Sequence, residues 1–159
     1  MLAMAARGAL AGAAATWLMD LVTTGLVEGQ SPETAEREEA ARPNGKGAVA
    51  NLIDRIDSDY RLSLSDGQRL ALTEAIHFGL GMAPGALYAV VRHRLPLVGA
   101  GRGLLYGLVL WAVNDEYLNI KLGLAGPFDA YPLETHWRGL VGHAVLGVGT
   151  DVGIDLLGG

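Results

Sequence analysis

Four segments of this chain are long and apolar enough to cross a lipid bilayer, and they constrain its fold more than any other feature. They are residues 8–27, 72–91, 103–125 and 137–157. Each holds close to the ~20 residues that cross ~30 Å of hydrocarbon at ~1.5 Å per residue in an α-helix. Apolar residues surround these predicted helices instead of forming one stripe, which favours lipid around them over a water-soluble four-helix bundle, the alternative. We therefore predict an all-α integral membrane bundle of four transmembrane helices.

The composition agrees with a membrane protein and excludes several other classes. Only 18% of the 159 residues are charged, against ~25% in soluble domains, and this length predicts a single domain. A net charge of -5 without a basic stripe excludes nucleic acid as a partner. There is no cysteine, and no catalytic or nucleotide-binding motif occurs, so the sequence supports no enzymatic activity and identifies no cofactor.

Every predicted span contains two glycines four residues apart. Such pairs form a flat strip on which two helix backbones can approach closely in lipid. We expect these faces to pack helices together and to support a homo-oligomer. The pairs are Gly8 and Gly12, Gly81 and Gly85, Gly103 and Gly107, and Gly149 and Gly153.

A polar insert, residues 28–71, separates the first two spans and is predicted to be helical. Ser31 followed by Pro32 is typical of a helix start, and Ser65 with Gln68 fits a capping box that begins the second span. Apolar residues at helical spacing in residues 49–56 predict a short amphipathic helix. We expect it to pack on the end of the bundle; the alternative is an anchor on the membrane surface.

Ionisable side chains interrupt all four spans, most conspicuously in the sequence Asn-Asp-Glu at residues 114–116. A charged group in hydrocarbon costs at least ~2.5–3.5 kcal/mol unless it is paired, neutralised or facing water. With ~1.5 Å per residue, most of these groups fall in one layer about 6 Å thick within the bilayer. We therefore predict a shared intramembrane polar layer built from Asp20, Glu74, His77, Asp115, Glu116 and His143.

The residues suggest specific pairings within that layer. The threonines near Asp20 could hydrogen-bond its carboxylate, and Glu74 shares a helix face with His77. His136, Asp151 and Asp155 are interpreted as interfacial or helix-end residues outside the layer.

Three functions are compatible with such a layer. It could bind or relay a proton, an ion or a small solute, because histidine titrates near neutral pH. It could hold a metal, because Glu74-x-x-His77 with Asp20, Glu116 and His143 resembles the ligands of di-iron bundles, although the second Glu-x-x-His motif is missing. Alternatively, the protein is a non-catalytic structural or assembly subunit whose buried polar residues only fix helix packing.

The distribution of basic residues predicts the orientation. Arg92, Arg94 and Arg102 in the short second loop lie on the same side as Arg7, which favours termini in the cytoplasm. The insert carries six Lys or Arg residues, which favours the opposite, but they are spread over a long segment.

Several segments of the sequence resemble a known family. GALAGAAATWLMD, HFGLGMAPGALYAVVRHRLP, GRGLLYGLVLWAVNDE and AYPLETHWRGLVGHAVLGVGTD are similar to the YagU-like bacterial inner-membrane proteins, which carry a domain of unknown function. The resemblance covers about two thirds of the chain. It implies a helical fold and a location in the bacterial inner membrane, and it brings no established reaction or ligand residues.

Overall fold

The computed structural model describes residues 1–159 and contains only helices. The all-α prediction is confirmed. The elements in order are α1 (Leu2–Glu28), α2 (Pro32–Ala41), η1 (Pro43–Gly45), α3 (Ala48–Tyr60), α4 (Asp66–Val91), α5 (Leu104–Leu110), η2 (Trp111–Leu118), α6 (Asn119–Lys121), η3 (Phe128–Ala130) and α7 (Leu133–Leu156).

Three helices, α1, α4 and α7, are long and apolar enough to cross a membrane. The third predicted span, residues 103–125, forms a different structure from the uniform α-helix expected. It is divided into α5, η2 and α6, which follow one another without a break from Leu104 to Lys121. The middle piece, η2, is a π-helix, in which the amide of Asn119 bonds to the carbonyl of Asn114.

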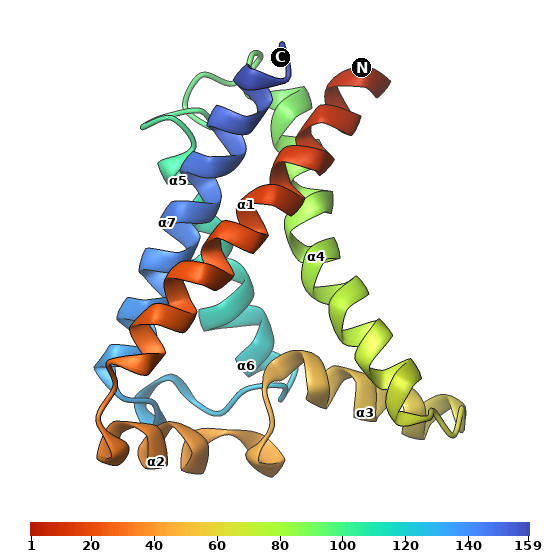
Figure 1. The fold of residues 1–159 in the computed structure, drawn as a ribbon, viewed down its shortest axis with the longest axis vertical. Helices are drawn as coiled ribbons and strands as arrows, with labels where there is room; N and C mark the ends of the chain where they lie inside the picture. The colour runs from red at the N-terminus through yellow and green to blue at the C-terminus, as the bar shows by residue number, and fades with distance from the viewer.

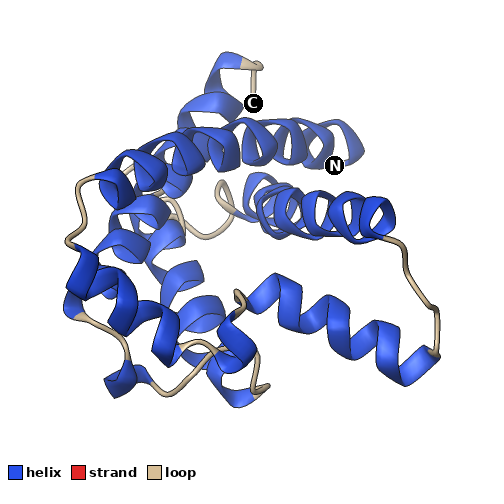
Figure 2. Ribbon diagram, turned by 60° about the horizontal axis from the view of Figure 1, so that its bottom comes forward, coloured by secondary structure: helices blue, strands red, loops and turns tan.

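The long elements run alternately along the bundle. Both termini lie at one end, and α5, η2 and α6 lead from that end, where α4 finishes, back to the end where α7 begins (Figure 1). Helix α1 packs against both α4 and α7, whereas α5 packs mainly against α7. The short helices α2 and α3 lie across the end of the bundle away from the termini (Figures 1 and 2).

Glycine contacts hold the long helices together, as their spacing predicted. A Cβ added at Gly8 or Gly12 would collide with the backbone carbonyls of Gly85 and Gly81 on α4. On the other side of α1, a Cβ at Gly149 or Gly153 of α7 would lie 3.2 or 2.9 Å from the Cβ atoms of Ala15 and Ala11. Gly103 and Gly107 meet the backbone of α7 at Gly147 and His143. All four predicted glycine pairs are therefore used within the chain.

The helix caps of the insert form as the sequence predicted, and α3 packs on the bundle end. The Ser31 hydroxyl accepts the amide of Thr34 at 3.1 Å, and Ser65 and Gln68 form the reciprocal capping box. On α3, Ile53 is buried, and the side-chain amide of Asn51 donates to the carbonyl of Leu124 at 3.0 Å. The expected packing of this amphipathic helix on the bundle is observed.

Candidate functional site

The acidic pair Asp115 and Glu116 lies in the π-helix η2, beside α7. A π-helical turn carries an extra residue, so it changes the direction in which successive side chains point, and such turns are frequent at functional sites. The two neighbouring carboxylates bind two different histidines of α7. The side-chain amide of Asn114 donates to Asp115 Oδ1 at 2.8 Å.

Glu116 pairs with His136, near the start of α7. The distance from His136 Nδ1 to Glu116 Oε1 is 2.8 Å, and His136 Nε2 lies 3.1 Å from the carbonyl oxygen of Phe128. The side chains are only 11% and 17% exposed. The ring of Phe128 stacks on the imidazole with centroids 4.0 Å apart, which covers the pair from the loop side.

The two acceptors around His136 determine where its protons are. A carbonyl oxygen only accepts, so Nε2 carries a proton and donates it to Phe128. Nδ1 then bonds to Glu116 through one further proton, carried by either the imidazole or the carboxyl group. The pair therefore holds one proton that can move between Glu116 Oε1 and His136 Nδ1, which lie 2.8 Å apart.

Asp115 pairs with His143, about two helical turns beyond His136 on α7. His143 Nδ1 donates to the backbone carbonyl of Gly139 at 3.0 Å and lies 3.6 Å from Asp115 Oδ2. The histidine side chain is buried, whereas that of Asp115 is 34% exposed.

Asp20 pairs with His77 between α1 and α4. His77 Nε2 lies 2.9 Å from both carboxylate oxygens. His77 is one turn from Gly81 on α4, and Asp20 is about two turns from Gly12 on α1. Both side chains are half-buried. The hydroxyl of Thr23 bonds to backbone carbonyls of α1, so the expected hydrogen bonds from threonines to the Asp20 carboxylate are not formed.

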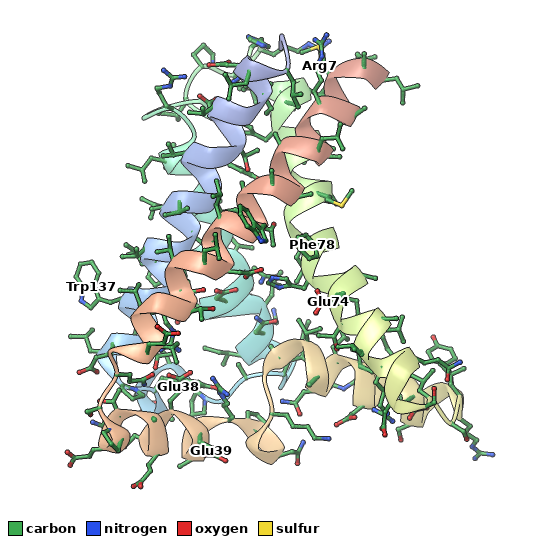
Figure 3. All side chains as sticks on the ribbon, in the orientation of Figure 1. Arg7, Glu38, Glu39, Glu74, Phe78 and Trp137 are labelled. Carbon is green, nitrogen blue, oxygen red and sulfur yellow. The ribbon has the colours of Figure 1, made fainter.

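Glu74 lies apart from these pairs. It is exposed on the lower half of α4 (Figure 3) and makes no hydrogen bond or ion pair. The expected Glu74–His77 pair is not formed, because His77 bonds to Asp20.

The predicted layer is therefore divided into separate acid–histidine pairs. The contacts of Gly149 with Ala15 and of Gly142 with Thr23 set the register of α1 against α7, and they place Asp20 level with the turn of His143. The Glu116–His136 pair lies nearer the end that carries α2. No three histidine, aspartate or glutamate side chains come close enough together to hold a metal ion. The metal-binding arrangement of Glu74, His77 and their neighbours is not assembled.

Asp151 and Asp155, interpreted as interfacial or helix-end residues, lie in the last two turns of α7, but Asp151 is buried there in a charge cluster. Its carboxylate is buried and accepts hydrogen bonds from the Tyr88 hydroxyl at 2.6 Å and from Arg92 at 2.7 Å. Arg92 also bonds to Asp155, which in turn accepts from Arg102 at 2.9 Å. A sequence signal existed, because His143, Asp151 and Asp155 recur at multiples of four residues and share one face of α7.

A second buried charge cluster lies at the opposite end, around Glu38 of α2. Its carboxylate accepts from Arg138 at 2.6 Å, Gln30 at 3.2 Å and Thr135 at 3.0 Å, and it also pairs with Arg42. Burial by itself would raise the pKa of Glu38. The hydrogen bonds and positive charge of Arg138, with the bonds from Gln30 and Thr135, outweigh that effect and lower the pKa to about 2. Sequence reasoning did not find this cluster, because its members come from α2, from α7 and from the loop between α1 and α2.

Comparison of the chain with protein-family models, with curated proteins and with solved structures finds no match.

Proposed function

We propose that the chain is a four-crossing bacterial inner-membrane protein whose buried acid–histidine pairs bind and pass protons. Three crossings correspond to α1, α4 and α7. The unbroken helix from Leu104 to Lys121 provides the fourth crossing. It would be ~27 Å long if it were wholly α-helical. An even number of crossings agrees with the two termini lying at the same end (Figure 1).

The observation that carries the proposal is the pair of acceptors around His136. A histidine between a carbonyl and a carboxylate holds one proton in common with its acidic neighbour, which is the arrangement that a proton-binding site needs. Buried ionisable residues in membrane helices are expensive and typically mark proton or ion pathways. The Asp115–His143 pair lies on the same η2–α7 interface and offers a second protonatable partner.

One observation favours a structural role as the second candidate. Of the six predicted residues, only Glu74 lacks a partner; the other five are paired within the chain. In this second candidate, the mutually bonded groups have the single role of fixing helix register, and the site passes no protons.

Proton flux into proteoliposomes separates the two candidates. The proposal expects a pH-driven flux that falls at least tenfold in Glu116→Gln, because glutamine can still donate to His136 Nδ1 but has no proton to exchange. Glu39→Gln serves as the matched control, because Glu39 is exposed on α2 and makes no hydrogen bond or ion pair (Figure 3). A wild-type protein with no flux above that of empty liposomes would refute the proposal, and so would full flux in Glu116→Gln.

We further propose that both termini face the cytoplasm. Arg7 donates to the carbonyl of Gly158 at the C-terminus, and the loop between α4 and α5, at the same end of the bundle, carries Arg92, Arg94 and Arg102. The positive-inside rule places such a basic end in the cytoplasm. The chain has no cysteine, so a single cysteine at Ser58 or Gly159 can be labelled without background. Labelling of Ser58→Cys but not Gly159→Cys from outside the cell membrane supports this orientation; the reverse pattern contradicts it.

Self-association remains part of the proposal, with one change. The glycine faces expected to join two copies are already filled by α1, α4 and α7 of the same chain. A homo-oligomer would therefore use other surfaces, which light scattering with detergent correction can detect.

A further inference from the structure

Two cavities follow one another along the groove between α1 and α7. The first, of about 410 Å³, lies where α1 ends and α7 begins. The second, of about 510 Å³, lies nearer the middle of the two helices. Val141 lines both, so the two cavities are neighbours in one groove. Their lining includes the exposed side chains of Leu18 and Trp137, so the groove is open to the surroundings of the bundle.

The two cavities differ in polarity. Apart from Gly149, the second is lined only by hydrophobic side chains, among them Val145 and Val148. Trp137, in the lining of the first, points away from the bundle (Figure 3), as tryptophans do at the level of lipid headgroups. The groove therefore has a polar end and an apolar stretch, which are the two parts of a membrane lipid. The polar lining of the first cavity is Gln30, Ser31, Thr34, Glu134 and Arg138.

The length of the groove matches one leaflet of a bilayer. From Arg138 in the first cavity to Val148 in the second, α7 extends about 15 Å at ~1.5 Å per residue. The hydrocarbon core of a bilayer is ~30 Å thick, so one leaflet contributes about 15 Å. An acyl chain whose headgroup occupies the first cavity therefore reaches the bilayer centre beside Val148.

The charges of the polar end favour a headgroup that carries a cation. Arg138 donates to Glu38 at 2.6 Å, so its charge is already compensated within the protein. Glu134 is exposed in the lining, and no hydrogen bond or ion pair engages its carboxylate. The Thr34 hydroxyl accepts from Ser31 at 3.0 Å and keeps its own proton available to donate. The cavity thus offers a carboxylate to a cation and a hydroxyl to an anion.

We propose that one phospholipid with a primary ammonium headgroup, phosphatidylethanolamine, binds in this groove. Its ammonium pairs with Glu134, its phosphate accepts from the Thr34 hydroxyl, and one acyl chain packs along the apolar stretch against Val145 and Val148. Charge complementarity selects the headgroup, and van der Waals contact holds the chain. The proposal rests on the membrane location proposed above and is independent of proton transfer.

Native mass spectrometry of the full chain tests the headgroup preference. The protein is released from micelles that hold equal amounts of phosphatidylethanolamine and phosphatidylglycerol with the same acyl chains. The expected result is one retained phosphatidylethanolamine per chain, about tenfold more often than phosphatidylglycerol. Glu134→Gln abolishes the preference, because it removes the charge that pairs with the ammonium. Glu39→Gln, exposed on α2 and outside both cavities, keeps it.

A second pair of variants tests the place of the acyl chain. Ala144→Leu fills the apolar stretch and lowers retention of the lipid about tenfold, whereas Ala83→Leu, exposed on α4 and outside both cavities, leaves it unchanged. Equal retention of the two lipids by the wild type, or an unchanged preference in Glu134→Gln, would overturn the proposal. A lipid-free dimer that Ala144→Leu dissociates would overturn it too, and would show that a second copy fills the groove.

The same preparation separates failure of this site from failure of the proposed function. A chain that stays in solution without detergent would refute the membrane location and the lipid site with it. A chain that needs detergent but retains neither lipid would overturn the lipid site alone. Proton flux does not enter the measurement, so the lipid result stands whether or not the acid–histidine pairs pass protons.

Discussion

Replacing Glu38 with glutamine removes the only negative charge that contacts both Arg138 and Arg42. Glu38 is the centre of the cluster that joins α2 to α7, and its carboxylate is 7% exposed. The substitution keeps the size of the side chain. The loss of stability therefore measures the charge–charge and charge-assisted hydrogen bonds, with little change in packing.

The pKa of Glu38 gives the size and the pH dependence of the effect. A fall from 4.5 to about 2 corresponds to about 3 kcal/mol in favour of the charged form. The cluster lies at the end of the bundle, where water screens it in part, so we expect Glu38→Gln to lower the free energy of unfolding by about 2 kcal/mol at pH 7. Because folding lowers this pKa, the stabilisation is complete above about pH 5 and is lost as the pH falls towards 2.

Reversible unfolding in mixed micelles, followed by circular dichroism from pH 7 to pH 2, measures this difference. Glu39→Gln is the control; Glu39 is the next residue, is exposed and has no partner, so its loss should stay within about 0.5 kcal/mol. Equal effects of the two substitutions at pH 7 would refute the reasoning. A Glu38→Gln deficit that stays constant down to pH 2 would also refute it.

Two further substitutions test the packing of the long helices. Gly12→Ala should cost about 1–3 kcal/mol in unfolding free energy, because its Cβ meets the backbone of Gly81, whereas Gly25→Ala, with open space around it, should be neutral or stabilising by up to ~1 kcal/mol; similar values for the two would contradict the observed α1–α4 contact. Asp151→Asn should cost about 3 kcal/mol, because it leaves the buried Arg92 with only the half-exposed Asp155 as a charged partner, and the exposed Asp129→Asn should change stability by less than about 0.5 kcal/mol. A small loss in Asp151→Asn would indicate that water reaches the cluster.

Features encoded by neighbouring residues were predictable from the sequence. The caps at Ser31 and Ser65 form as expected, because a cap depends on residues within one turn. The glycine pairs were also recognised as packing faces. Their partners were not, because Gly149 and Gly153 meet alanines of α1, and Gly103 and Gly107 meet a different stretch of α7. Which face meets which depends on how each helix is rotated and shifted against its neighbours.

The polar residues were likewise predictable one by one, but their pairing was not. Hydropathy and spacing identified Asp20, Asp115, Glu116 and the histidines of the spans, but not their partners. His136 was interpreted as an interfacial or helix-end residue, yet it binds Glu116 of η2, a π-helix whose side chains do not follow the 3.6-residue period of an α-helix. Nothing in a single sequence marks where such a turn will form.

The most direct test of the account is the protonation state of His136 in a bilayer. Nitrogen-15 NMR of the imidazole in lipid nanodiscs, assigned with His136→Gln, reports each ring nitrogen separately as the pH changes. The account predicts that Nε2 stays protonated, bonded to the Phe128 carbonyl, while the Nδ1 signal shows a hydrogen bond to the Glu116 carboxyl group and changes in Glu116→Gln. An unprotonated Nε2, or an Nδ1 signal that is the same with and without the Glu116 carboxyl group, would contradict it.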